Sequence, residues 1–312
     1  MLEFLLFFLP ALYLGWTLGG NDAANVFGPA VTTGAVRFLM AALLAGLFVL
    51  AGALLQSQNV MGTYGALASQ TPVTAALLSL GAAVSVTAFL VLGLPTSVTQ
   101  TVVGALVGLT VAQGGLAAVE WPLLARLLVA WTLAPVGAGL LAYVLYRLST
   151  RWLESYLRGL DTYDRIMALG FLVMSAYGAY SLGANNVANI TGVYVEAGML
   201  TPLTGALLGA AGIALGMLTG SRRVIRTVGF ELTSLTSFSG LVILTTEGLV
   251  LHLYAMAGVP VSASQAVIGG IIGVGLAHSG RMNWSKLARI GVAWVSAPIA
   301  AGILAALLSR LI

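Results

Sequence analysis

The sequence predicts an all-α polytopic membrane protein built from two inverted-topology repeats, with broken helices or re-entrant hairpins. The first observation is composition: of the 312 residues, 59% are hydrophobic, 7% are charged, and the mean hydropathy is +1.02. A soluble domain of this length does not have such a composition. The second observation is a series of ten apolar stretches, and the third is a group of motifs that occur twice at a nearly constant offset.

The apolar stretches form two groups of five, and each is long enough for a helix of about 20 residues to cross a bilayer. In order they are 2–34, 38–56, 73–93, 96–115 and 122–146, followed by 166–198, 201–219, 232–256, 261–279 and 287–309. We expect the first and sixth to be interrupted, because each contains Gly and Asn residues that weaken a helix. Five is an odd number, so the second group is expected to be inverted relative to the first. A re-entrant hairpin at 73–115 in place of two spans leaves the parity unchanged.

Basic residues indicate the orientation of the chain. Arg37 and the segments 147–165, 222–226 and 281–289 all fall on one side if every stretch crosses, and the positive-inside rule makes that side cytoplasmic. Both termini are then expected outside. The predicted organisation is a first transmembrane repeat at 1–146, a cytoplasmic linker at 147–165 and a second repeat at 166–312, in a multi-pass protein of the cell membrane.

Three motifs support an internal duplication. The polar decapeptide Gly19–Gly28 has a second copy at Gly183–Gly192, in which Asn185 follows Asn21 by 164 residues. The offset is 165 residues between Gly93-Leu-Pro-Thr-Ser-Val-Thr-Gln and Gly258-Val-Pro-Val-Ser-Ala-Ser-Gln, and 163 between Trp131 and Trp294, each of which precedes an Ala-Pro pair. Three motifs at one offset identify a repeat.

The Pro-Thr-Ser motif and its second copy predict an anion site. Pro95 suits the first turn of a helix, and Thr96 or Ser97 can cap its N-terminus. A helix N-terminus inside the membrane presents backbone N–H groups and a positive dipole end to an anion. Two such elements, one from each repeat, would form a cradle for a tetrahedral oxyanion. The residues expected to bind it are Asp22, Thr96, Ser97, Thr99, Gln100, Asn186, Ser262, Ser264 and Gln265.

The asparagine clusters predict a sodium site. Asn residues at positions i and i+4 lie on one helical face, and their amide oxygens, with the carboxylate of Asp22, are the hard ligands that suit Na⁺. The residues expected to bind sodium are Asn21, Asp22, Asn25, Asn185, Asn186 and Asn189. Polar groups in hydrocarbon also serve to join helices, but the repetition of the whole constellation favours a binding site.

Other features exclude several classes of function. The chain has no cysteine, so disulfides and thiolate metal sites are absent. His252 and His278 are far apart, and we expect structural roles for both. No phosphate-binding loop, catalytic triad or metal-ligand spacing occurs, so an enzyme is not expected. The net charge of +4 reflects topology and does not indicate a nucleic-acid partner. Glu231 and Glu247 have no counterpart in the first repeat, and Glu247 is a candidate for an ion path.

The paired motifs resemble those of the inorganic phosphate transporter (PiT) family of secondary symporters. Its signature is a duplicated Gly-x-Asn-Asp-x-x-Asn-x-x-Gly, matched at Gly19–Gly28 and less fully at Gly183–Gly192. The resemblance covers nearly the whole chain and implies inverted repeats, phosphate uptake usually driven by Na⁺ (H⁺ in some members), and often a homodimer. It also implies that the asparagines and Asp22 line the cation and phosphate sites, with hydroxyl ligands from Thr96, Ser97, Thr99, Ser262 and Ser264.

The chain departs from the family pattern in its core. Asn186 stands where the family usually has Asp, and Gln100 and Gln265 stand where it often has His. These changes concern ion coupling and stoichiometry more than fold. The favoured interpretation is a secondary active transporter that takes up inorganic phosphate with Na⁺, with no other cofactor, in contact with lipid. The alternatives are a permease of the same fold for sulfate or another tetrahedral oxyanion, possibly H⁺-coupled in the sense of proton symport, a channel, and a membrane-embedded enzyme.

Overall fold

The computed structural model describes residues 2–32, 34, 36–92, 94–156, 160–221, 236–278 and 282–311. Within these ranges the chain is helical and contains no strand. The first half comprises α1 (Leu2–Thr32), α2 (Phe38–Gln56), α3 (Gln58–Leu67), α4 (Pro72–Val91), α5 (Val98–Gly114), η1 (Leu116–Ala118) and α6 (Trp121–Tyr156). The second half comprises α7 (Leu160–Asn186), α8 (Ala188–Glu196), α9 (Pro202–Thr219), α11 (Ser237–Met256), α12 (Ala263–His278), α13 (Trp284–Leu308) and η2 (Ser309–Leu311).

The predicted class, an all-α multi-pass membrane protein, is confirmed. Among the described residues, seven helices are long and apolar enough to cross a membrane, and α5 and α12 are shorter apolar helices. Many large apolar side chains lie exposed along the outer helices, where a bilayer would cover them. The arginines of 222–226 and Glu231 lie outside the described residues.

Two expectations about local structure are wrong. The stretch 57–72 contains the helix α3, although we expected a loop. The first asparagine cluster does not interrupt its helix, because α1 continues from Leu2 to Thr32. At the second cluster only Val187 separates α7 from α8, and it keeps helical dihedral angles (φ −61°, ψ −32°). The asparagine side chains bond to other segments, so the helical backbone stays intact and tertiary contacts override a weak propensity.

The helix breaks lie elsewhere, between α4 and α5 and between α11 and α12. The chain leaves the helix at Leu92 and re-enters it at Val98, with the Ser97 hydroxyl accepting a hydrogen bond from the Gln100 backbone N–H (3.2 Å). In the second half the Ser262 hydroxyl accepts one from the Gln265 N–H (3.3 Å). The predicted cap at Thr96 or Ser97 is therefore confirmed as Ser97. Each break exposes a helix N-terminus inside the protein.

The two halves contact each other reciprocally. α1 packs on α9 as α7 packs on α2, and α5 packs on α13 as α12 packs on α6. Glycines allow these close approaches: a Cβ on Gly19 would overlap the Ile213 carbonyl oxygen, and a Cβ on Gly183 would overlap that of Val49. Gly19 and Gly183 are counterparts in the sequence repeat, so the same packing device occurs in both halves.

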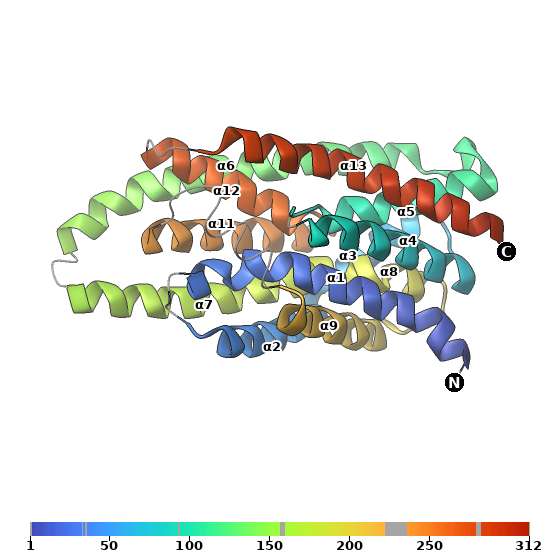
Figure 1. The fold of residues 1–312 in the computed structure, drawn as a ribbon, viewed down its shortest axis with the longest axis horizontal. Helices are drawn as coiled ribbons and strands as arrows, with labels where there is room; N and C mark the ends of the chain where they lie inside the picture. The colour runs from blue at the N-terminus through green and yellow to red at the C-terminus, as the bar shows by residue number, and fades with distance from the viewer. Residues whose placement is uncertain are drawn as a thin grey trace.

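Counterpart helices also run in opposite directions along the long axis of the molecule. In Figure 1, α1 starts near the N-terminus at the right, whereas α7 starts at the left; α6 ends at the left, whereas α13 ends near the C-terminus at the right. This arrangement is the one that an inverted repeat requires, although the orientation of the halves in a membrane stays a prediction.

Candidate ion and anion site at the helix breaks

Asp22 is the centre of a buried polar network that joins the two halves. Its carboxylate Oδ1 accepts hydrogen bonds from Asn21 Nδ2 (2.8 Å), Asn25 Nδ2 (3.2 Å) and Ser264 Oγ (3.2 Å). Its Oδ2 accepts one from Asn186 Nδ2 (3.2 Å). α1 supplies three of these five residues, and α12 and α7 supply the others. Four donors stabilise the ionised form of a carboxylate that is only 2% exposed.

Asn21 and Asn185 hold the two helix breaks in the same way. Asn21 accepts from the backbone N–H of Thr96 through Oδ1 (3.1 Å) and donates from Nδ2 to the Thr96 carbonyl (2.9 Å). Asn185 accepts from the N–H of Val261 through Oδ1 (3.0 Å) and donates to the Val259 carbonyl (3.1 Å). These bonds satisfy backbone groups that the breaks expose in a dry interior. The predicted Na⁺ ligation by these asparagines would use the second lone pair of the same oxygens.

A second chain of hydrogen bonds links α8 to the other helix break. Asn189 donates from Nδ2 to Thr99 Oγ1 (3.0 Å), and Thr99 donates in turn to the Val261 carbonyl (3.0 Å). The Asn189 Oδ1 accepts from the hydroxyl of Tyr64. Tyr64 lies on α3, which we expected to be a loop, and no motif in the sequence marks it. Thr99 and Asn189 are thus brought together, and Tyr64 closes one side of the site.

Several buried oxygen atoms at the centre have no partner in the described part of the chain. They are Asn25 Oδ1, Asn186 Oδ1, Thr96 Oγ1, Gln100 Oε1 and Gln265 Oε1. Buried acceptors without a partner are costly, so their presence beside a carboxylate fits a site that binds ions. The carboxylate and amide oxygens match the donor set that Na⁺ takes.

The predicted site residues therefore converge on the breaks. Of the thirteen, twelve are buried, and Gln100 is partly exposed. The hydroxyls of Ser97 and Ser262 cap helices, and those of Thr99 and Ser264 bond to the asparagine network. The assignment of each residue to sodium or to the anion stays a prediction.

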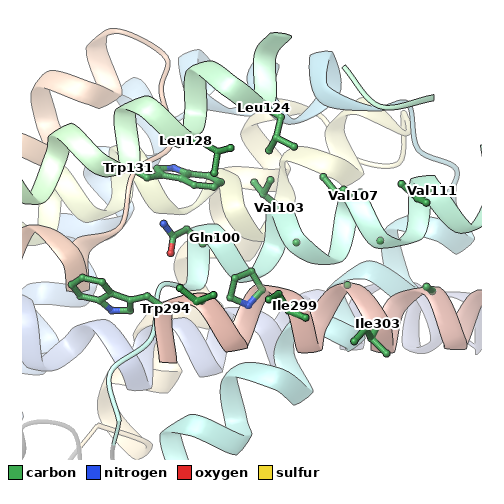
Figure 2. A pocket seen from close by; sticks show the side chains of 16 residues that line it. Gln100, Val103, Val107, Val111, Leu124, Leu128, Trp131, Trp294, Ile299 and Ile303 are labelled. Atoms are coloured by element: carbon green, nitrogen blue, oxygen red, sulfur yellow. The ribbon is translucent and has the colours of Figure 1, made fainter. Parts of the chain in front are cut away.

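Two apolar cavities lie on the outer side of the site. One has a volume of about 670 Å³ and is lined by α5, α6 and α13. Figure 2 shows Gln100 near one end of it, between Trp131 and Trp294, with the valines of α5 along its wall. The second, of about 570 Å³, is lined by the counterpart helices α12, α13 and α6. Apolar walls do not bind a hydrated oxyanion, so neither cavity replaces the site at the breaks.

Comparison with known proteins identifies the family. Residues 18–168 and 160–305 each match the sequence profile of the Phosphate transporter family, PHO4. The chain belongs to the phosphate transporter family. The two matches correspond to the two halves described above, and together they cover most of this family member.

Individual relatives of this phosphate transporter family member carry two kinds of name. A Pyrococcus horikoshii protein, named as a candidate phosphate permease, is 27% identical and aligns over 96% of this chain and 95% of its own. The sulfate permease CysP of Bacillus subtilis is 31% identical over 86% of this chain and 76% of its own. A solved structure named the sodium-dependent phosphate transporter has a TM-score of 0.84 at 21% identity, covers 100% of both chains, and shows that the fold is shared.

Proposed function

We propose that this protein takes up inorganic phosphate by symport with Na⁺. The observation that carries the proposal is the Asp22 network, in which donors from α7 and α12 bind a carboxylate of α1. A site shared between two halves can change its access when the halves move relative to each other. Family membership supports phosphate as the substrate class, and the name of the structural neighbour supports sodium.

The cation would bind between Asp22, Asn25 and Asn186. The amide oxygens of Asn25 and Asn186 are buried without a partner, and the Nδ2 atoms of the same side chains hold the Asp22 carboxylate. A cation there would satisfy both oxygens and offset the carboxylate charge. It would also reduce the repulsion between Asp22 and an incoming anion.

The anion would bind at the N-termini of α5 and α12. Both ends point into the breaks, and Thr96 adds a buried hydroxyl without a partner. Each end offers backbone N–H groups and a positive dipole end. In the described part of the chain no lysine or arginine is buried, so neutral donors would carry the binding. Such a site can release its anion more readily than one with a fixed positive charge.

Sulfate is the second candidate, because the 31% identical relative is named a sulfate permease. The carboxylate of Asp22 favours phosphate. Phosphate keeps a P–OH donor near neutral pH and can donate to the carboxylate, whereas sulfate has only acceptors. An unmatched buried polar pair costs about 1–3 kcal/mol, which corresponds to tenfold or greater discrimination.

The membrane arrangement is part of the same proposal. The two halves would be inverted repeats, with residues 147–165 cytoplasmic and both termini outside. α6 continues to Tyr156 and α7 begins at Leu160, so much of the linker is helical. A homodimer, as the family resemblance implies, would be embedded in lipid.

Radiolabelled uptake into proteoliposomes tests the function. Phosphate and sulfate should be compared with an inward Na⁺ gradient, with an inward H⁺ gradient, and with neither. Phosphate accumulation that requires Na⁺ supports the proposal. Accumulation of sulfate in preference to phosphate, or accumulation driven by H⁺ alone, would replace it with the second candidate.

A further inference from the structure

Glu247 is a buried acid that the proposed site does not use. It lies in the middle of α11, a candidate membrane span, and is 0% exposed. Neither of its carboxyl oxygens has a hydrogen-bond partner in the described part of the chain. Ionisable side chains inside a membrane protein are costly, and those that occur usually serve function. The residue therefore requires an explanation.

Charge compensation at Glu247 differs from that at Asp22. Four side-chain donors contact the Asp22 carboxylate, whereas none contacts Glu247. The two acids are close enough to repel each other electrostatically. Every described lysine and arginine side chain is at least partly exposed, so no basic group in that part of the chain neutralises the pair. The compensating charge has to come from solution.

The internal repeat shows that packing does not require this acid. Positions offset by 165 residues are counterparts at the caps and at the helix breaks, and on this offset the counterpart of Glu247 is Ala82. Ala82 is also 0% exposed. Asp22 in turn has Asn186 as its counterpart. Each half thus contributes one buried carboxylate, but from a different helix, and the second is an addition to the repeat.

We propose that Glu247 is a second cation-binding carboxylate, which takes up one monovalent cation, Na⁺ or H⁺, in each transport cycle. This inference rests on the proposed function. Neutralising both acids would let the core change its access to the two membrane faces without moving an unpaired charge. The cation-to-phosphate ratio would then be at least two, with one cation near Asp22 and one at Glu247.

Both sources of the cation are distinguishable, because few other groups in this region titrate. α11 packs against α1, α6, α7 and α12. Besides Asp22, the titratable side chains along these helices and α11 itself are Tyr13, Arg126, Tyr143, Tyr146, Arg147, Tyr163, Asp164, Arg165, Tyr177, Tyr180, His252, Tyr254 and His278. The arginines and Asp164 are exposed, and His252 and His278 each bond to a tyrosine hydroxyl through Nδ1.

The test compares Glu247→Gln with wild type in proteoliposomes. The limiting accumulation ratio of radiolabelled phosphate is measured at zero membrane potential under a tenfold Na⁺ gradient and, separately, under a tenfold H⁺ gradient. Loss of one coupled cation lowers this ratio about tenfold under the gradient of the ion that Glu247 takes up. Under the other gradient the variant and wild type should agree. Glu120→Gln, the same change at an exposed acid, should behave as wild type under both.

A ratio unchanged in the variant under both gradients would overturn the inference. If Glu247→Gln is folded but shows no net uptake, exchange of internal for external phosphate decides, because exchange moves no net cation. Retained exchange supports the inference, and lost exchange with an unchanged melting temperature overturns it. Glu247→Met must reproduce the result, since it also removes the charge.

The wild type alone supplies an arm that does not depend on the folding of a variant. Phosphate accumulation that rises with only the first power of the combined cation gradients would contradict a second cation. If wild type accumulates no phosphate under any gradient, it is the proposed function that fails. These two failures are therefore distinct.

Discussion

Replacing Asp22 with Asn tests how the central carboxylate acts. The substitution keeps the size of the side chain and one acceptor oxygen, which can still receive the three donors on Oδ1, from Asn21, Asn25 and Ser264. The new amide nitrogen then faces Asn186 Nδ2, formerly a 3.2 Å donor to Oδ2. Two donors cannot bond, so we expect the Asn186 amide to rotate and accept with Oδ1. That rotation removes one of the proposed sodium ligands.

The magnitude follows from these contacts. A hydrogen bond to a charged group contributes about 1.5–3 kcal/mol and a neutral one about 0.5–1.5 kcal/mol. Loss of the charge and of one ligand should therefore weaken Na⁺ binding by about 1.5–3 kcal/mol. The Na⁺ concentration for half-maximal phosphate uptake should rise about tenfold to a hundredfold.

The ratio of phosphate to sulfate uptake separates two roles for the carboxylate. If Asp22 contacts the anion, Asp22→Asn should lose phosphate preference and gain sulfate transport, because the new amide donates to sulfate. If Asp22 serves the cation alone, the Na⁺ dependence should weaken while the ratio of the two anions stays constant. Unchanged Na⁺, phosphate and sulfate affinities would remove Asp22 from the site.

The double variant Asp22→Asn with Asn186→Asp is the matched control. It moves the carboxylate to the counterpart position in the second half and restores the net charge. Partial recovery of Na⁺ affinity is expected if the charge at the interface of the halves is what binds the cation. No recovery, with both proteins folded, would show that the position on α1 matters more than the charge.

Three further substitutions test packing, ligation and topology. Gly19→Ala should lower the melting temperature, because its Cβ would overlap the Ile213 carbonyl; Gly62→Ala, with no neighbour within 4 Å, is the control and should not, and equal melting temperatures would refute the packing argument. Asn25→Ala should raise the half-saturating Na⁺ concentration, and an unchanged value would exclude it as a ligand. A cysteine at Ser155 should react with an impermeant maleimide only from the cytoplasmic side, and labelling from outside would reverse the topology.

Much of this protein could be predicted from the sequence, because the relevant signals are local. Hydropathy depends on composition, so the membrane class and most of the helices follow from it. The cap at Ser97 depends on residues three positions apart, and the duplication depends only on repeated letters. The set of polar residues around the breaks was identifiable because amides, hydroxyls and acids are rare in apolar segments.

Tertiary structure alone decided which of these residues meet. Asp22 bonds to Ser264, 242 residues away, and no spacing in the sequence encodes such a contact. The continuity of α1 depends on Asn21 finding the Thr96 backbone, a partner outside its own helix. Tyr64 belongs to the site because α3 packs against α8. The isolation of Glu247 is likewise a property of its surroundings, because whether a buried carboxyl has a partner depends on long-range packing that local propensity cannot specify.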